Sequence, residues 1–252
     1  MKCRLVGHGK FPIDELYDAV SAVKSSVIVI DAMPDELVSV GLDKTAMMSY
    51  YWTMRADWFD KYELDERFVF SIDLERVGSW FELLMEKWGK IMTGPETYTV
   101  TVDEKWMEIE TRGCKFSIPV TVLGPEVSFV RSEVMKLDTF ARVETEQLED
   151  MMKRMRKKGF RVVSIEKTPK FLVFRGGNEK DSSEDVYMIE FSDGMGQAKS
   201  SYLFRYLDPA VRIMRKYSYN VLIEFDNNRP IRITPCESRL KSYIGFAIAP
   251  LV

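Results

Sequence analysis

Histidine and cysteine, the residues most often used in nucleophilic and metal chemistry, are scarce in this chain. His8 is the only histidine, which excludes His-based catalytic triads and sites with several histidine ligands. We expect it to face solvent in the turn after a first strand. Cys3, Cys114 and Cys236 lie far apart, without the spacing of metal ligands. They are expected to be free thiols in a reducing compartment.

Carboxylates are plentiful, but their positions favour turns over chemistry. The pairs Asp103-Glu104 and Glu184-Asp185 lie in expected turns, where acidic side chains accept hydrogen bonds from the backbone. No glycine-rich loop followed by Lys and Ser or Thr is present to cradle a phosphate. The segment Gly194–Gly196 reads as a turn. The sequence therefore predicts no catalytic residue, no metal and no cofactor. An enzyme using Asp103 or Asp185 for metal-assisted chemistry is kept as an alternative.

The composition indicates a globular protein of one or two domains. The chain has 252 residues, of which 46% are hydrophobic. With 36 basic and 39 acidic residues its net charge is −3, so it is not a polycation that attracts nucleic acid in bulk. No apolar run approaches the roughly 20 residues that span a bilayer, and no signal-peptide pattern follows Met1. We expect an intracellular protein, in the cytoplasm or nucleoid, or in the nucleus of a eukaryote.

Two parts of the sequence resemble two later parts in the same order. Residues 30–41 align with residues 165–176 through an Ile, an acid, a Pro, a Leu-Val pair and a Gly. Residues 98–103 align with residues 219–224 in the pattern Tyr-x-Val-x-β-branched-acid. A stable order of matches predicts two similar domains whose loops differ in length. Two copies are too few for a solenoid.

The periodicity predicts the same plan in each half, mostly strands with two helices. This is a duplicated α+β architecture, with domains at 1–122 and 134–252. The interdomain connector is placed at 123–133, around Gly124-Pro125. Late in the chain, Ser201–Tyr206 reads as a strand, and a short helix is expected to open at Asp208-Pro209 with the proline in its first position.

Basic residues gather on the exposed faces of three of the four expected helices. In the helix over 145–158, apolar residues at helical spacing leave the lysines and arginines facing solvent. The helix after Asp73 and the helix near 211–216 show the same arrangement. Such faces are either solvated surface or an anion-binding surface. The candidates are Arg76, Lys87, Lys90, Lys153, Arg154, Arg156, Lys157, Arg212, Arg215 and Lys216.

Several segments, taken in order, resemble the sliding clamps of the proliferating cell nuclear antigen (PCNA) family, nearest to the archaeal members. Their positions span essentially the whole chain. Leu42–Met47 resembles the family's apolar-Asp-small segment before a strand, and the other segments resemble strand and turn signatures. These are Trp58–Asp65 ("F-x-x-Y-x-x-D"), Lys115–Val120, Ser201–Leu207 ("Y-x-x-x-Y-L"), Arg229–Ile233 ("x-P-L-x-I/L") and Ala247–Pro250 ("L-A-P").

The resemblance implies a DNA-clamp fold in a trimeric ring, with strands in an outer layer and helices lining a hole around duplex DNA. It implies a non-enzymatic processivity factor without sequence specificity. DNA polymerase, clamp loader, nuclease and ligase would dock through short apolar motifs. By position, the partner-binding residues are Leu42, Val127, Phe129, Val130, Pro230, Ala247 and Ala249. Edge strands would join the subunits through Cys114, Phe116, Ile118, Val186 and Met188.

Three departures from the family pattern suggest a second reading. The first helix exposes Asp14, Glu15 and Asp18, Ala247 is small where an aromatic residue is frequent, and the chain ends without an acidic tail. These features also fit a specialised or partner-dependent subunit of a heterotrimeric ring, or a relative used in damage signalling. The sequence leaves homotrimer and heterotrimer open.

Overall fold

The described part of the chain forms two compact units. The computed structural model describes residues 2–8, 13–77, 97–111, 113–124, 135–176, 184–237 and 242–251. Unit 1 consists of Met1–Gly41, Tyr51–Val130 and Lys241–Tyr243, and unit 2 of Leu42–Tyr50, Arg131–Leu240 and Ile244–Val252. The domain boundaries predicted from the sequence, with a connector at 123–133, stay a prediction.

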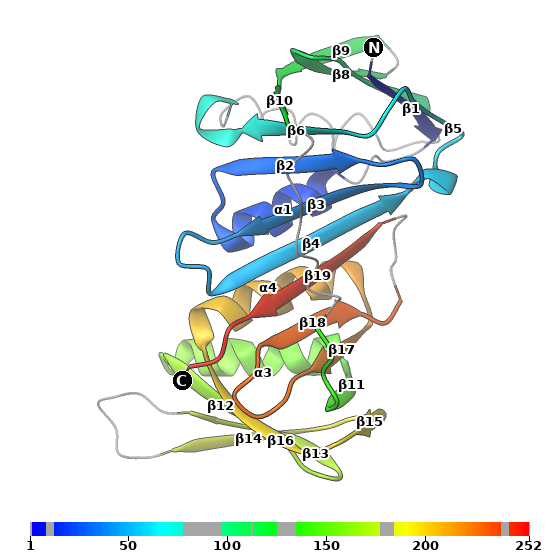
Figure 1. Ribbon diagram of the computed structural model, residues 1–252. Helices are drawn as coiled ribbons and strands as arrows, with labels where there is room; N and C mark the ends of the chain where they lie inside the picture. Colours follow the sequence, from blue (N-terminus) through cyan, green and yellow to red (C-terminus); the bar gives the residue numbers. More distant parts are fainter. Residues whose placement is uncertain are drawn as a thin grey trace. The chain divides into compact units, whose positions relative to one another are not determined.

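Unit 1 is built mainly from the first ten strands (Figure 1). Their order is β5-β1-β7-β8-β9 in one group and β10-β6-β2-β3-β4 in the other. Its described helical segments include α1 (Ile13–Val23) and a short 3-10 helix η1 (Ala56–Trp58). The strands are β1 (Cys3–His8), β2 (Val27–Ala32), β3 (Glu36–Leu42), β4 (Met48–Arg55), β5 (Lys61–Leu64), β6 (Phe68–Asp73), β7 (Thr97–Val102), β8 (Trp106–Thr111), β9 (Cys114–Pro119) and β10 (Thr121–Leu123).

Unit 2 is built mainly from the remaining strands and two helices. Its strand orders are β15-β11-β17-β18-β19 and β14-β13-β12-β16. The helices are α3 (Thr145–Lys157) and α4 (Phe204–Tyr217). The strands are β11 (Phe140–Glu144), β12 (Val162–Lys167), β13 (Phe171–Gly176), β14 (Asp185–Glu190), β15 (Asp193–Met195), β16 (Ala198–Leu203), β17 (Asn220–Glu224), β18 (Ile231–Pro235) and β19 (Tyr243–Ile248).

The two units share one topology, which confirms the predicted duplication and the α+β class. Strands β1 to β9 of unit 1 occupy the same places in the strand orders as β11 to β19 of unit 2. The β2–β3 hairpin pairs Ile30 with Ser39, and the β12–β13 hairpin pairs Ile165 with Phe174. These are the positions that the sequence alignment equates. The hydrophobic pattern has therefore preserved the register, since a slip of one residue would turn every core side chain outward.

The strands of each unit alternate between a buried and an open face, as strands covered on one side must. In β1, Cys3 and Leu5 are 1% and 2% exposed, while Arg4 and Val6 are partly exposed. In unit 2, Val221 and Ile223 of β17 are buried in the same way. The largest fully buried side chains include Trp52 and Tyr50 of β4 and Tyr202 of β16.

Helix α1 corrects one expectation about its acidic face. Glu15, predicted to be exposed, is 1% exposed, and it shares the buried side of the helix with Leu16, Ala19, Val20 and Val23. The buried stripe is thus wider than the apolar residues alone indicate. The helix after β6 begins as predicted: residues 74–77 are helical. The Asp73 carboxylate accepts hydrogen bonds from the N–H groups of Glu75 and Arg76, at 2.9 and 3.2 Å.

Helices α3 and α4 pack against each other and contact strands of both groups in unit 2 (Figure 1). The helix predicted over 145–158 is α3. The predicted start of α4, at Asp208-Pro209, was wrong: the helix begins at Phe204, and Pro209 lies inside it. The helix extends back to Phe204 because Phe204, Leu207, Val211 and Met214 form a continuous buried stripe. No helix among the described residues is long and apolar enough to cross a membrane.

A smaller correction concerns Gly194–Gly196, which was expected to be a turn. Asp193–Met195 forms the short strand β15, which pairs with β11. Only Gly196 has turn geometry, with φ of +76°. Gly194 lies where a Cβ would come within 2.7 Å of the Phe140 carbonyl oxygen. The glycine therefore permits a close strand approach, which composition alone does not distinguish from a turn.

Candidate nucleic-acid interface and partner surface

The predicted basic residues of α3 and α4 lie on the solvent side of the helix pair. In α3, Leu148, Met151, Met152 and Met155 are buried. The cations Lys153, Arg154, Arg156 and Lys157 are exposed, as are Arg212 and Lys216 of α4, while Arg215 is half-buried. The two helices together carry eight basic and four acidic residues. The pair is therefore a net cationic surface within a chain that is acidic overall.

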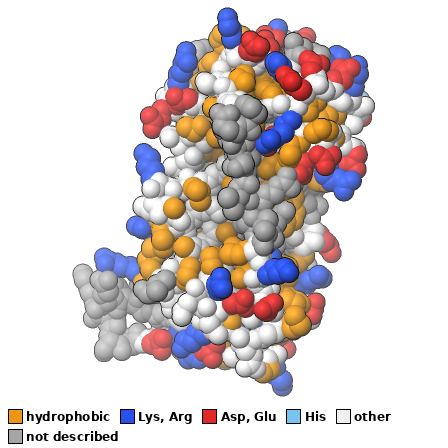
Figure 2. Space-filling view, viewed as in Figure 1, with side chains coloured by type: hydrophobic (Ala, Val, Ile, Leu, Met, Phe, Trp, Pro, Cys, Tyr) orange, Lys and Arg blue, Asp and Glu red, His pale blue; other side chains and the backbone are white. Residues whose placement is uncertain are grey.

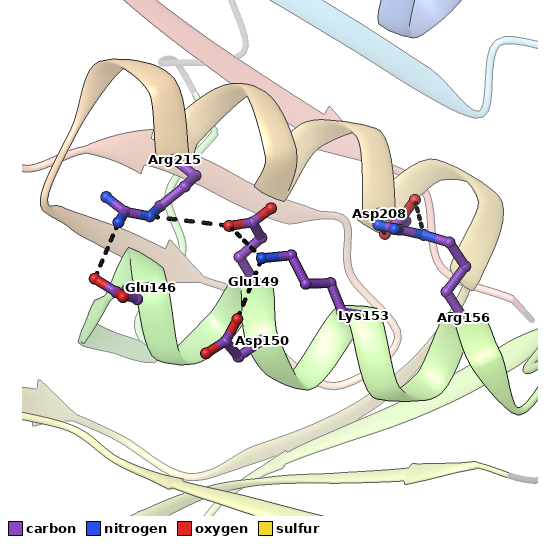
Figure 3. Close-up of polar contacts among 7 residues, drawn as sticks. All are labelled: Glu146, Glu149, Asp150, Lys153, Arg156, Asp208 and Arg215. Carbon is purple, nitrogen blue, oxygen red and sulfur yellow. Dashed lines mark hydrogen bonds and ion pairs between the residues drawn. The ribbon is translucent and has the colours of Figure 1, made fainter.

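Asp208, a buried acid of α4, holds two of these arginines. Its carboxylate accepts hydrogen bonds from the Arg156 guanidinium, and the Nε–Oδ2 distance is 3.1 Å. Arg212 Nε lies 3.4 Å from Asp208 Oδ2. Figure 3 shows Asp208 facing Arg156 across the helix pair. Asp208 is 6% exposed, so this carboxylate depends on the two arginines to compensate its desolvation.

Acids at the start of α3 hold the other end of the helix pair (Figure 3). Arg215 donates to Glu146 at 3.0 Å and lies 3.9 Å from Glu149. Lys153 bridges Glu149 and Asp150 at 3.2 and 3.3 Å. Much of the positive charge predicted to face an anion is thus already paired within the protein. A phosphate would have to compete with these carboxylates for Arg215 and Lys153.

Arg154 and Lys157 differ from their neighbours on α3. Both are exposed, and within the described part of the chain neither forms an ion pair. Arg76 is likewise exposed, in the first turn after β6. The remaining candidates, Lys87 and Lys90, lie outside the described residues. Among the described candidates, the cations most available to an anion are therefore Arg76, Arg154 and Lys157.

The strand side of unit 2 differs from the α3–α4 side in the described residues seen in Figure 2. In Figure 1, β18 lies in front of α4, which it contacts. On the face seen from this side, Lys and Arg side chains are interspersed with Asp and Glu (Figure 2). The net cationic character of the α3–α4 pair therefore contrasts with the mixed charges on the face drawn in Figure 2.

The described residues predicted to bind partners all belong to unit 2. Leu42 is 58% exposed, Pro230 and Ala249 are partly exposed, and Ala247 is buried at 9%. Leu42 is therefore the large apolar side chain that this set presents to solvent. Val127, Phe129 and Val130 lie outside the described residues. Whether these positions form one binding surface remains a prediction.

A loop of residues 42–47, called here the Leu42 loop, is anchored by Asp43. Asp43 Oδ1 accepts hydrogen bonds from the N–H groups of Met47 and Met48, at 2.6 and 2.8 Å. The N–H of Ala249 donates to the Met47 carbonyl oxygen at 2.8 Å. The loop is thereby tied to the C-terminal segment that carries two of the predicted partner-binding residues.

Two tyrosines at the junction of β16 and α4 contact these segments. Tyr206 Oη lies 3.1 Å from Asp43 Oδ2 and 2.9 Å from Thr45 Oγ1. The Tyr202 hydroxyl donates to the carbonyl oxygen of Arg229, the residue before Pro230, at 2.9 Å. The sequence contained the signal, the Y-x-x-x-Y-L pattern of Ser201–Leu207, but gave these tyrosines no role.

Hydrogen bonding sets the charge state of Asp43. Its partial burial alone would raise the pKa of the carboxyl. Donation from the Thr45 hydroxyl, the Met48 N–H and the Tyr206 hydroxyl outweighs burial, and the pKa of Asp43 is lowered below its ordinary value. The anchor of the loop is therefore a carboxylate at neutral pH.

Strands β9 and β14, predicted to join subunits, each stand at the end of a strand order. Phe116 and Ile118 of β9 pair with the buried Ile109 and Met107, so they lie on the core face. Cys114 shares that face at the start of the strand. Val186 and Met188 of β14 are 49% and 64% exposed on the other face of their strand.

The five predicted interface residues therefore do not share one face. On the core face of β14 lie Tyr187 and Ile189, opposite the buried Phe174 and Leu172. The Tyr187 ring makes an edge contact with Phe160, at 6.2 Å between centroids. Side chains on one face of two paired strands meet each other. If β9 and β14 pair, Tyr187 and Ile189 are the β14 residues that could face the core side of β9, and the sequence analysis did not name them.

The architecture is that of the PCNA sliding clamps. A. fulgidus PCNA, in a structure with the C-terminal region of FEN-1 bound, matches with a TM-score of 0.76 and 15% identity, over 99% of this chain and 98% of that chain. A chain of the PCNA2–PCNA3 complex from Sulfolobus tokodaii gives 0.78 at 17% identity, with 98% of each chain covered. PCNA from Thermococcus kodakaraensis gives 0.76 at 17% identity, over 99% and 100%.

By sequence, no family model and no curated protein matches the chain. The structural likeness establishes a full-length clamp fold of two similar domains, as predicted. At these identities it establishes the fold alone.

Proposed function

We propose that this protein is a DNA sliding clamp, a processivity factor that forms a trimeric ring around duplex DNA and tethers replication and repair enzymes. The observation that carries the proposal is the full-length clamp fold, with one topology repeated in both units. A duplicated unit with unpaired strands at its ends can close into a ring by repeating a single kind of contact.

The DNA-facing surface in this proposal is the α3–α4 pair, with Arg76, Lys87 and Lys90 contributed by the N-terminal half. A ring is linked topologically to DNA, so it can stay bound with weak, sequence-independent phosphate contacts. The internal ion pairs of Lys153, Arg156, Arg212 and Arg215 suit this role, because they limit the charge offered to any one phosphate. Arg154 and Lys157 would make the more persistent contacts.

The subunits would join by pairing β9 of one copy with β14 of the next. Each strand stands at the end of its order, and such an edge presents unpaired N–H and C=O groups. The outer β14 side chains Val186 and Met188 are exposed and apolar. Charge adds little to this argument, since Lys115 of β9 already pairs with Glu108 at 3.0 Å and Asp185 of β14 with Lys158 at 2.7 Å.

Partners would bind at the Leu42 loop and the C-terminal segment, together with the connector residues Val127, Phe129 and Val130. The FEN-1 segment bound to A. fulgidus PCNA supports a short peptide ligand of this kind. The proposed partners are a polymerase, a clamp loader, a nuclease and a ligase, each inserting apolar anchors beside Leu42. We place the protein where such enzymes act, inside the cell.

A non-enzymatic scaffold fits the carboxylates better than the metal-dependent alternative. The Asp103 carboxylate accepts hydrogen bonds from the N–H groups of Lys105 and Trp106, at 2.7 and 2.8 Å. Asp185 forms an ion pair with Lys158 at 2.7 Å. Both acids kept as metal candidates thus have structural partners, as acids in turns and at strand ends generally do.

A specialised subunit of a heterotrimeric ring is the second candidate. Helix α1 carries three acids and no basic residue, so this helix would offer DNA no positive charge in any ring that it lines. The PCNA2–PCNA3 complex shows that a matching fold in Sulfolobus tokodaii associates with a different subunit.

Light scattering on the purified protein tests the proposal first. Three times the chain mass is expected for a self-sufficient ring, which should also increase the product length of a DNA polymerase in a primer-extension assay. A monomer at all concentrations that is recruited into a trimer by a related subunit would favour the mixed ring. A monomer that neither associates with a related subunit nor affects any polymerase would overturn both forms.

A further inference from the structure

The Leu42 loop is fixed from one side by its own backbone and from the other by helix α4. Asp43 Oδ1 is occupied by the N–H groups of Met47 and Met48. Asp43 Oδ2 accepts from the Thr45 hydroxyl and lies 3.1 Å from Tyr206 Oη. One carboxylate therefore serves two purposes: Oδ1 shapes the loop, and Oδ2 fastens it to α4.

Arg205 orients the tyrosine for this contact. Its Nη2 donates to Tyr206 Oη at 3.1 Å, and its guanidinium carbon lies 4.8 Å from the centre of the Tyr206 ring. A phenol has one proton to donate. With the arginine donating to the phenol oxygen, that proton is left for the acceptors Asp43 and Thr45. The charge on Asp43 makes it the stronger acceptor.

We infer that Tyr206 is a positioning residue that holds the Leu42 loop, through Asp43, in the shape that partner binding requires. The inference rests on the partner surface proposed above. Tyr206 itself would not contact the partner, because its hydroxyl is directed at the loop anchor Asp43. The loop carries the exposed Leu42 and, through the bond from Ala249 to Met47, the C-terminal segment.

The test compares Tyr206→Phe with a matched control, Tyr62→Phe. Both changes remove only a hydroxyl. The Tyr62 hydroxyl donates to the Met33 carbonyl oxygen at 2.6 Å, in unit 1 and outside the predicted partner surface. The probe is the FEN-1 C-terminal peptide, with its dissociation constant measured by fluorescence anisotropy. For Tyr206→Phe we expect binding about three- to tenfold weaker, chiefly through faster dissociation. For Tyr62→Phe we expect unchanged binding.

A double-mutant cycle with Asp43→Asn separates positioning from a general loss of stability. If Tyr206 acts through Asp43, the double variant should bind the peptide no more weakly than Asp43→Asn alone. Amide hydrogen exchange adds a readout that needs no ligand. Exchange at Met47 and Met48 should accelerate in Tyr206→Phe and stay unchanged in Tyr62→Phe.

The outcomes distinguish this inference from the proposed function. If the unchanged protein fails to bind the peptide while Met47 and Met48 still exchange faster in Tyr206→Phe, the partner surface is wrong and the loop anchor stands. Peptide binding by Tyr206→Phe equal to that of the unchanged protein, with unchanged exchange, would overturn the inference. Additive effects in the cycle would also overturn it, because the two residues would then act independently.

Discussion

Asp208 is the buried acid on which two arginines of the basic helix faces converge. Its 6% exposure and its contacts with Arg156 and Arg212 mean that it would limit the charge that α3 and α4 could offer to DNA in the proposed function. Asp43 is likewise an acid that several groups contact at the proposed partner surface, where its carboxylate fixes the shape of the Leu42 loop. At the residue scale, acids set the properties of both proposed surfaces, although the basic and apolar residues are the ones that would touch ligands.

Asp208→Asn should weaken the fold and strengthen DNA binding together. Removing the charge leaves the Arg156 and Arg212 guanidinium groups without their carboxylate, and the free energy of unfolding should fall by about 1 to 3 kcal/mol, measured by urea denaturation. The released arginines should tighten binding to a short duplex and steepen its salt dependence. A destabilised variant with unaltered salt dependence would show that these arginines do not face DNA.

The lowered pKa of Asp43 predicts how the stability contribution of this residue depends on pH. A carboxyl whose pKa is lower in the folded state contributes stability that is present above the unfolded pKa, about 3.9 for aspartate. That contribution is lost as the pH falls through the folded pKa. Asp43→Asn should therefore melt at a lower temperature than the unchanged protein at pH 7, and the gap should narrow as the pH falls below the unfolded pKa. Calorimetry across this range checks it; a gap that is constant with pH would contradict the assignment.

Helix α3 shows at the scale of elements how one amphipathic segment combines a core and a surface function. Its buried Leu and Met stripe fixes its orientation, and its cations divide into a paired group and an unpaired group. The C-terminal position of Arg154 and Lys157 suits the helix dipole, which stabilises cations in the last turn. The dipole can therefore stabilise these two exposed cations, which have no carboxylate partner among the residues that the structure describes.

Arg154→Ala with Lys157→Ala should weaken binding to duplex DNA. It should also reduce the slope of log K against log salt by about two, because each of the two cations would neutralise one phosphate. Stability should change by less than about 0.5 kcal/mol, since both side chains are exposed. Lys153→Ala is the control and should have a smaller effect, because Glu149 and Asp150 already hold that lysine. Equal effects of the double variant and the control would argue against a DNA-facing α3.

Strand β14 gives a test of assembly that leaves the fold intact. Met188 is 64% exposed, so Met188→Asp should barely alter the stability of one chain, while it places a charge at the proposed subunit contact. We expect the trimer to dissociate at a concentration at least about tenfold higher, followed by analytical ultracentrifugation. Met195→Asp, at a methionine 60% exposed on β15, is the control. If both variants assembled equally well, the proposal that β14 forms the subunit interface would be wrong.

At the scale of the whole molecule, the two units share one topology. A chain that repeats one strand order twice, and leaves β9 and β14 at the ends of their orders, can be extended by further copies of itself. To the proposed ring, unit 1 would contribute the acidic α1 together with the exposed Arg76, and unit 2 the basic α3–α4 pair.

Ring formation should change the reactivity of one cysteine and spare the others. Burial raises the pKa of the Cys3 thiol to about 12, so iodoacetamide should leave it unmodified near neutral pH in the native protein. Cys114 lies partly exposed on β9, at the proposed interface, and its labelling should slow as the protein concentration rises. Cys236, also partly exposed, at the end of the interior strand β18, is the internal reference. Concentration-independent labelling of Cys114 would contradict assembly through β9.

The sequence by itself determined the duplication, the strand-rich α+β class and the course of α3. Alternating and helical periodicities are local, and the hairpins around residues 30–41 and 165–176 kept the same hydrophobic register. The exposed positions of the α3 cations followed from the same periodicity. The start of α4 did not, because its buried stripe reaches back to Phe204 through packing that a local propensity cannot weigh.

Only the tertiary structure decided which charges are available and which side chains position others. Asp208 meets Arg156 across two helices, and Tyr206 reaches Asp43 over 163 positions of sequence. Glu15 became buried although its type predicted exposure. Ion pairs and hydrogen bonds depend on distances of a few ångströms between segments remote in the chain. Sequence spacing fixes the face of an element on which a residue lies, and the fold fixes what that face meets.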